Sequence, residues 1–145
     1  MADDLMALYS KRILALASDI PHEGRLSEAQ GQAMRRSPQC GSSVTAFVNL
    51  DGGRISDFAQ EVRACALGQA SAAVLGGAVI GLSRGELEAA LGQLDAMLDG
   101  GAEPPAAPFA ELEVLGAARD YPNRHASIRL AWQAAIDAIG AAETQ

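Results

Sequence analysis

The fold of this chain is decided by residues 44–63, which read VTAFVNLDGGRISDFAQEVR. In residues 44–50, an apolar set of side chains stands at every second position, from Val44 to Leu50. This period of two predicts a β-strand with one buried face. Asp51-Gly52-Gly53 is typical of a tight turn, and residues 54–63 can return as a second strand. The alternation slips between Ile55 and Phe58, so we expect a β-bulge or an early strand end there. The stretch therefore predicts an antiparallel hairpin.

Helical patterns stand on both sides of the hairpin. Before it, Asp3 or Asp4 can cap an amphipathic helix with one apolar stripe, formed by Leu5, Leu8, Tyr9, Ile13 and Leu16. After it, residues 65–79 are rich in alanine and suit a buried helix. Residues 83–86 read Ser-Arg-Gly-Glu, which matches a capping box, and leucines continue at helical spacing until Gly100-Gly101. A last helix is expected from about Asn123, with Trp132 on its apolar face.

The remaining segments give weaker signals. Residues 25–38 are polar and form either a loop or a weak first strand. Residues 102–108 contain three prolines and form a loop, and residues 109–118 can hold a short helical turn. This order of elements predicts an α+β fold in which a small antiparallel sheet is covered on one face by helices. No repeat or change of composition marks a second domain, so residues 1–145 are expected to form one domain.

The charge balance limits the class of partner. The net charge is -7 and the pI is about 4.7, so neither a nucleic acid nor an anionic membrane surface is expected as a partner. Residues 64–81 carry no charge, but alanine and glycine dominate them and a bilayer span is not expected. Residues 1–6 lack the pattern of a signal peptide, which favours a cytoplasmic protein. In that compartment Cys40 and Cys65 are expected to be free thiols or metal ligands rather than a disulfide.

Three stretches, taken in order, resemble one protein family. They read PQCG at residues 38–41, ACALGQASA at 64–72 and YPNRHASIRLAW at 121–132. On these stretches the chain is similar to the NifU amino-terminal family, whose IscU- and SufU-like members are scaffolds for iron-sulfur cluster assembly. The resemblance implies a SufE/NifU-like fold and a non-enzymatic role. It also implies a transient Fe-S cluster, iron or zinc as cargo, and a cysteine desulfurase as partner.

The resemblance further implies a set of ligand positions. In the family each of the three stretches supplies a cysteine, and an aspartate two residues after the first cysteine supplies an exchangeable fourth ligand. Cys40 and Cys65 keep two of these positions. Ser42 stands at the aspartate position and Ser127 at the position of the last cysteine, and a hydroxyl is a poor ligand beside a thiolate. His125 could replace a missing ligand if the last helix started one residue differently.

Three functions follow as alternatives. The first is a scaffold that binds iron, zinc or a cluster through Cys40 and Cys65, with missing ligands supplied by His125, water, another thiol or a second subunit of a homodimer. The second is a SufE-like sulfur acceptor, because one reactive cysteine suffices to accept persulfide sulfur from a desulfurase. The third is a diverged interaction protein that keeps the fold and neither chemistry.

Overall fold

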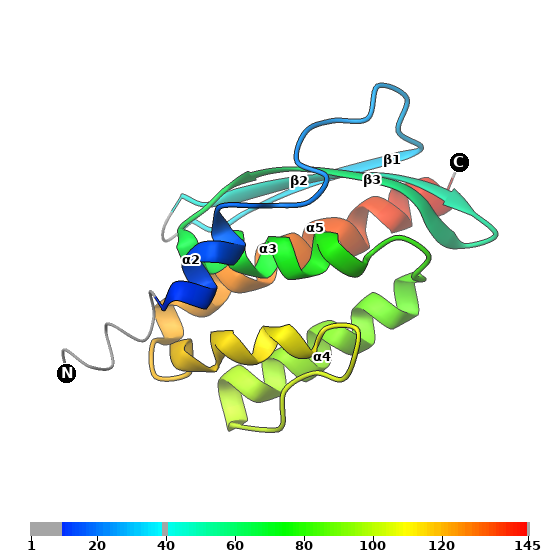
Figure 1. Cartoon of the computed structure of the whole chain (residues 1–145). Coiled ribbons are helices and arrows are strands. Elements are labelled where there is room, and N and C mark those ends of the chain that lie inside the picture. Colours follow the sequence, from blue (N-terminus) through cyan, green and yellow to red (C-terminus); the bar gives the residue numbers. More distant parts are fainter. Residues whose placement is uncertain (1–9, 39–40, 145) are drawn as a thin grey trace.

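The computed structural model describes residues 10–38 and 41–144, which form an antiparallel sheet with helices on one of its faces (Figure 1). The strands are β1 (Gly31–Arg36), β2 (Ser43–Asp51) and β3 (Arg54–Arg63), in this order across the sheet. The helices are α2 (Lys11–Ala17), α3 (Ala66–Ala78), α4 (Arg84–Gly100) and α5 (His125–Glu143), and the 3-10 segments η1 (Ala110–Ala118) and η2 (Pro122–Arg124) precede α5. The predicted α+β fold is confirmed.

β2 and β3 form the predicted hairpin. Gly52 and Gly53 make its turn with φ angles of 60° and 80°, a left-handed conformation that glycine adopts without steric cost. The pairing register shifts between Asn49 and Leu50, because Ser56 is an extra residue on β3. The predicted bulge is therefore confirmed at the point where the apolar alternation slips.

Residues 31–36 form a strand, which settles the choice between a loop and a weak first strand. β1 pairs antiparallel with β2, from Gly31 opposite Val48 to Arg36 opposite Ser43. The backbone of α5 crosses β1 so closely that a Cβ at Gly31 would overlap it. Most side chains of β1 are exposed, so this strand lacks the strong apolar alternation of β2.

The helical layer is organised around α5, which lies across β1 and β2, with α3 beside it and α4 packed against it farther from the sheet (Figure 1). Trp132 of α5 is fully buried, and its ring meets Phe109 edge to face with 4.8 Å between centroids. The Trp132 indole N–H donates to Ser71 Oγ of α3 at 2.9 Å. The Ser71 hydroxyl in turn donates to the Ile128 carbonyl at 2.7 Å. These contacts hold α3, α5 and the start of η1 in one core.

The ends of α4 follow the predicted caps. The Ser83 hydroxyl accepts from the Glu86 N–H, and the Glu86 carboxylate accepts from the Ser83 N–H. Gly101 ends the helix in the left-handed conformation, with φ of 69°. For the first helix, α2 begins at Lys11 with Ser10 as its cap, and the cap expected at Asp3 or Asp4 lies outside the described residues.

The uncharged stretch at residues 64–81 contains α3, which is 13 residues long and largely buried. In the part of the chain that the structure describes, no helix combines the length and apolar character that a membrane span requires. The burial of α3 against α2 and α5 accounts for its lack of charge.

The segment between α2 and β1 meets the outer edge of β3 at Gln60 and then loops away from the sheet before it reaches β1 (Figure 1). The Gln60 N–H donates to the His22 carbonyl at 3.0 Å, and the Gly24 N–H donates to the Gln60 carbonyl at 2.8 Å. His22 itself is exposed, with φ of 63°. At Gln60 the segment therefore occupies backbone groups that an edge strand would otherwise leave free for pairing.

Candidate functional site

Cys65 occupies the junction between the last strand and the buried helix. It is the residue that precedes α3, with φ of -68° and ψ of 171°, and its side chain makes no capping hydrogen bond. The thiol is free and half-buried. Cys65 is therefore held in place by the backbone at the start of α3, while its sulfur remains available for other contacts.

The sulfur of Cys65 begins a short chain of polar contacts. Cys65 Sγ lies 3.5 Å from Ser127 Oγ, and the Ser127 hydroxyl donates to Ser42 Oγ at 3.3 Å. Ser127 belongs to the first turn of α5 and Ser42 to the loop before β2, and both are at most 5% exposed. Three of the positions that the family resemblance marks as ligands are thus brought together from three different elements.

A glycine allows this convergence. A Cβ at Gly68, in the first turn of α3, would lie 2.6 Å from Ser127 Oγ and 3.1 Å from the Ser127 carbonyl oxygen. Such distances are shorter than van der Waals contact, so only glycine lets α3 and α5 approach this closely here. Gly68 lies within the ACALGQASA stretch, but no local sequence pattern marks it as the point where the two helices approach each other.

The loop that carries Ser42 is closed by backbone hydrogen bonds. The Ser37 N–H donates to the Ser42 carbonyl at 2.8 Å, and the Gly41 N–H donates to the Ser37 carbonyl at 2.9 Å. The Ser37 hydroxyl is buried and has no hydrogen-bond partner among residues 10–38 and 41–144. Cys40 lies outside the described residues, so the structure leaves its predicted role as a ligand untested.

His125 does not join this cluster. Its buried imidazole lies with Nε2 2.8 Å from the Ala118 carbonyl oxygen and Nδ1 3.3 Å from Asp99 Oδ1. Both ring nitrogens therefore face oxygen atoms of η1 and α4 rather than the sulfur of Cys65. In this conformation His125 ties the start of α5 to its neighbours and leaves no nitrogen free for a metal.

The donor atoms of the cluster are one thiol and two hydroxyls. Among residues 10–38 and 41–144, no group of three or more His, Cys, Asp and Glu side chains is placed to hold a metal ion. Because hydroxyls bind soft metals poorly, Cys65, Ser127 and Ser42 do not form a complete thiolate site. This donor set fits an iron or zinc cargo only with further thiolates, and Cys40 is the chain's one other cysteine.

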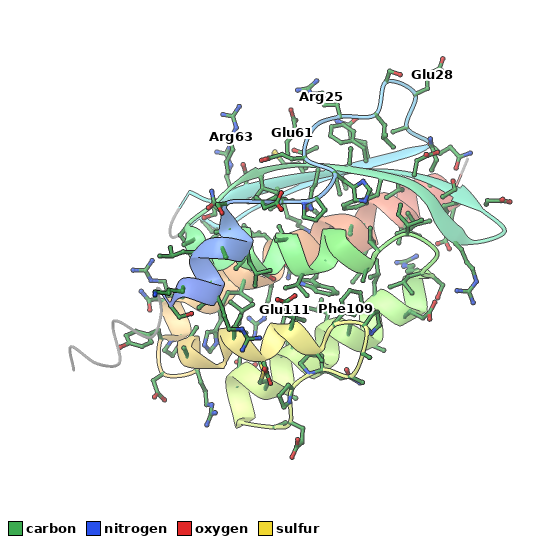
Figure 2. The ribbon with its side chains drawn as sticks, viewed as in Figure 1. Arg25, Glu28, Glu61, Arg63, Phe109 and Glu111 are labelled. Carbon is green, nitrogen blue, oxygen red and sulfur yellow. The ribbon has the colours of Figure 1, made fainter. Side chains whose placement is uncertain are left out.

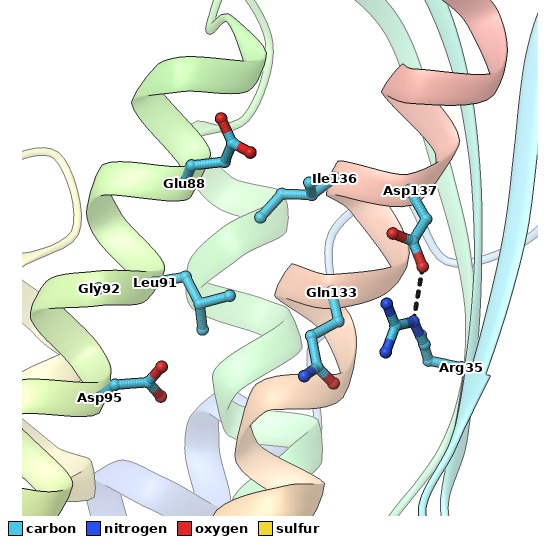
Figure 3. A pocket seen from close by; sticks show the side chains of 8 residues that line it. All are labelled: Arg35, Glu88, Leu91, Gly92, Asp95, Gln133, Ile136 and Asp137. Atoms are coloured by element: carbon cyan, nitrogen blue, oxygen red, sulfur yellow. Dashed lines mark hydrogen bonds and ion pairs between the residues drawn. The ribbon is translucent and has the colours of Figure 1, made fainter.

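A separate cavity of about 390 Å³ opens between α4, α5 and β1 (Figure 3). Gly92 lies in its α4 wall, where a Cβ would meet no other atom, and Leu91 and Ile136 supply apolar surface. Arg35 reaches across from β1 and pairs with Asp137 at 2.6 Å. The cavity contains none of the predicted ligands. Its lining residues come from three segments that are far apart in the sequence, so no local motif predicts the cavity.

Cys65 and Ser127 lie in the stretches that carry the family resemblance, and Ser42 follows the first of them. A comparison over most of the sequence finds the same family. The NifU-like N terminal domain family model matches residues 8–128. The chain belongs to this family. An iron-sulfur cluster assembly scaffold protein IscU from Streptococcus pyogenes serotype M1 is 30% identical to this NifU-like chain over 118 residues, which cover 81% of the chain and 74% of the relative.

Solved structures agree with the fold of this NifU-like domain. The nitrogen-fixing NifU-like protein (N-terminal) from Brucella abortus is 39% identical, with a TM-score of 0.93 over 98% of this chain and 99% of that chain. A putative iron-sulfur cluster assembly scaffold protein for the SUF system from Fervidobacterium islandicum AW-1 has a TM-score of 0.81 at 24% identity, over 91% of this chain and 96% of that chain. The second likeness concerns the fold alone.

Proposed function

We propose that this NifU-like chain is a non-catalytic scaffold for iron-sulfur cluster assembly. The observation that carries the proposal is the contact of Cys65 with Ser127 and of Ser127 with Ser42, at 3.5 Å and 3.3 Å. These three residues come from elements far apart in the sequence and stand at positions where the family carries ligands. The relative named as an IscU scaffold, and the 39% identity to the NifU-like Brucella protein, support the same function.

The cargo in this proposal is iron, zinc or a transient Fe-S cluster bound by the thiolates of Cys40 and Cys65. Two thiolates from one chain leave the coordination of a cluster incomplete, because such clusters are held by four ligands. A cysteine desulfurase that supplies the sulfur, or a second copy of this chain, would contribute the missing thiolates. Ser42 and Ser127 occupy the remaining positions as weak donors, so binding is expected to be labile.

The test is a gain of ligand at one position. Ser127→Cys places a third thiol next to Cys65 and, by the soft-ligand preference of iron and zinc, should raise the bound metal toward one equivalent per chain. Iron, zinc and acid-labile sulfide are measured on protein purified without oxygen, beside the wild type and the Cys40→Ser, Cys65→Ser double variant. The control Ser56→Cys adds a thiol at the exposed bulge of β3, away from the site.

Metal that rises in Ser127→Cys, stays at the wild-type level in Ser56→Cys and disappears in the double variant supports the scaffold. Absence of metal and sulfide from Ser127→Cys would overturn it, because a third thiol beside Cys65 would then still assemble no site. An equal rise in Ser56→Cys would also overturn it, since binding would then follow the number of thiols rather than their position.

The half-exposed, free thiol of Cys65 supports a second candidate function, the SufE-like sulfur acceptor. In this reaction the Cys65 thiolate attacks the outer sulfur of a desulfurase persulfide. The sulfur-sulfur bond of the persulfide breaks, and the desulfurase thiolate leaves. Mass spectrometry of metal-free protein, incubated with a cysteine desulfurase and cysteine, should then find one added sulfur atom on Cys65. A persulfide that still forms on Cys65→Ser protein would assign the transfer to another cysteine.

A further inference from the structure

The face of the sheet that points away from the helices carries a hollow of about 350 Å³ near the loop of Ser42. Figure 2 shows Arg63, Glu61 and Arg25 projecting from this side of the molecule. We call it the arginine hollow and define it by its lining residues, which are Met34, Arg36, Gly41, Ser43, Thr45, Glu61 and Arg63. None of these residues is among the predicted ligands.

Strand register arranges the polar groups of the arginine hollow in a row. Ser43 of β2 is paired with Arg36 of β1 on one side and with Arg63 of β3 on the other. The next residue of β2, Val44, is buried against the helices, so Ser43 and its two partners face outward. Because neighbouring strands lie roughly 5 Å apart, the two arginine backbones are about 10 Å apart with a hydroxyl between them.

Among the described residues, Arg36 and Arg63 form no ion pair, unlike most arginines of this chain. Within the described residues, carboxylates pair with Arg12, Arg25, Arg35, Arg54, Arg84 and Arg129. Arg36 and Arg63 are exposed and take part in no ion pair there. The acid of the hollow, Glu61, is already bound by Arg25 at 2.9 Å, and this hydrogen bond raises the pKa of the Arg25 guanidinium.

The arginine hollow is therefore a local positive site on a chain with a net charge of -7. Two guanidiniums on either side of a hydroxyl match carboxylates that are spaced along an extended peptide, because guanidinium and carboxylate form paired, charge-assisted hydrogen bonds. Met34 borders the hollow and is 56% exposed, and its flexible thioether can contact an apolar side chain of the same peptide.

We propose that the arginine hollow binds an acidic segment of a partner protein. Carboxylates of the segment pair with Arg36 and Arg63, Ser43 donates a hydrogen bond between them, and Met34 contacts an apolar residue. Ser42 directly precedes Ser43 but is buried against Ser127 of α5, so a partner bound here lies at the same end of the sheet as the candidate site and on the opposite face. None of these contacts involves a predicted metal ligand, so peptide binding tests the hollow independently of the scaffold function.

The probe is a fluorescein-labelled ten-residue peptide of Asp and Glu with one central Leu, titrated with the full chain at low salt and followed by fluorescence anisotropy. Each of Arg36→Gln and Arg63→Gln should weaken binding about fivefold, and the double variant about twenty-five-fold, if each exposed ion pair contributes independently. The control Arg119→Gln removes an exposed arginine of the helical layer that forms no ion pair with any described residue, and its binding should stay within about twofold of wild type.

Wild-type protein that does not bind the peptide would overturn the proposal, and so would a double variant that binds as tightly as wild type. A loss of binding in Arg119→Gln equal to that in the double variant would also overturn it, because the effect would then reflect net charge rather than the hollow.

A second experiment measures binding of the same proteins to phosphatidylserine vesicles. Vesicle binding that requires Arg36 and Arg63, without peptide binding, would assign the hollow to a membrane surface instead. Circular dichroism of each variant checks that its fold is intact.

Discussion

At the scale of single residues, the candidate site requires a residue without a side chain at position 68. Gly68 leaves room for the hydroxyl and carbonyl of Ser127, and a Cβ there would also lie 2.8 Å from the Cβ of Ala64. We predict that Gly68→Ala lowers the free energy of unfolding by about 1–3 kcal/mol, because the added methyl group forces apart two well-packed helices. Urea denaturation followed by circular dichroism measures the change.

The control for this prediction lies on the same helix. Gly77 is exposed near the end of α3, and a Cβ there would meet no other atom. Gly77→Ala should therefore leave the free energy of unfolding unchanged or raise it by up to about 1 kcal/mol, as expected of the better helix former. Equal effects of the two substitutions would mean that close approach of α3 and α5 does not constrain Gly68.

For single residues, the sequence predicts which positions come together better than it predicts where each side chain points. The resemblance placed Cys65, Ser127 and Ser42 at ligand positions, and the structure brings these three together. It did not fix the direction of His125. Successive residues of an α-helix are about 100° apart around its axis, so His125 and Ser127 point to different neighbours once α5 begins at His125. The direction depends on a helix boundary, and boundaries are the least certain part of a sequence-based prediction.

At the scale of secondary-structure elements, the cap of α4 predicts a pH dependence. The carboxylate of Glu86 accepts from the Ser83 backbone N–H, with further hydrogen bonds from the Ser83 hydroxyl and Arg54, and together these lower the pKa of Glu86 below 4.5. A carboxyl whose pKa is lower in the folded state contributes stability above its unfolded pKa and loses it as the pH falls through the folded pKa.

Glu86→Gln should therefore be less stable than wild type at neutral pH, and the difference should shrink as the pH falls below about 4.5. Thermal unfolding at several pH values measures this difference. Glu88→Gln serves as the control, because it removes a carboxylate of the same helix that takes no part in the cap. A difference between wild type and Glu86→Gln that stays constant from neutral to acidic pH would contradict the proposed origin of the shift.

Elements differed in how well the sequence predicted them. β2, β3 and α4 were predicted because alternation, a glycine turn and a capping box are local signals. The sequence does not decide between a loop and a strand for β1, because Gln32, Met34 and Arg36 face outward and Arg35 is held by Asp137 of α5. Some polar side chains of this strand face solvent, and others contact a helix that is far away in the sequence. Such a strand shows no alternation of apolar residues. Its identity therefore rests on tertiary contacts that a single sequence does not reveal.

At the scale of the whole molecule, Trp132 connects the layers. It is the chain's one tryptophan, it lies on the helix that crosses the sheet, and it contacts Ser71 of α3 and Phe109 before η1. Its fluorescence therefore reports on the packing of three segments, whereas far-ultraviolet circular dichroism reports mainly on the helices. Coincidence of the two signals would show that the core and the helices unfold together.

We predict that the two signals follow one transition in urea with the same midpoint, because a single buried cluster contains residues of the sheet, α3, α4 and α5. A helix that packed only on its neighbour could unfold first, and α4 is the one to consider because it lies farthest from the sheet (Figure 1). Its Leu87, Leu94 and Leu98 are nevertheless fully or almost fully buried in the common core. A circular dichroism midpoint below the fluorescence midpoint would contradict this prediction and identify α4 as a separate, less stable unit.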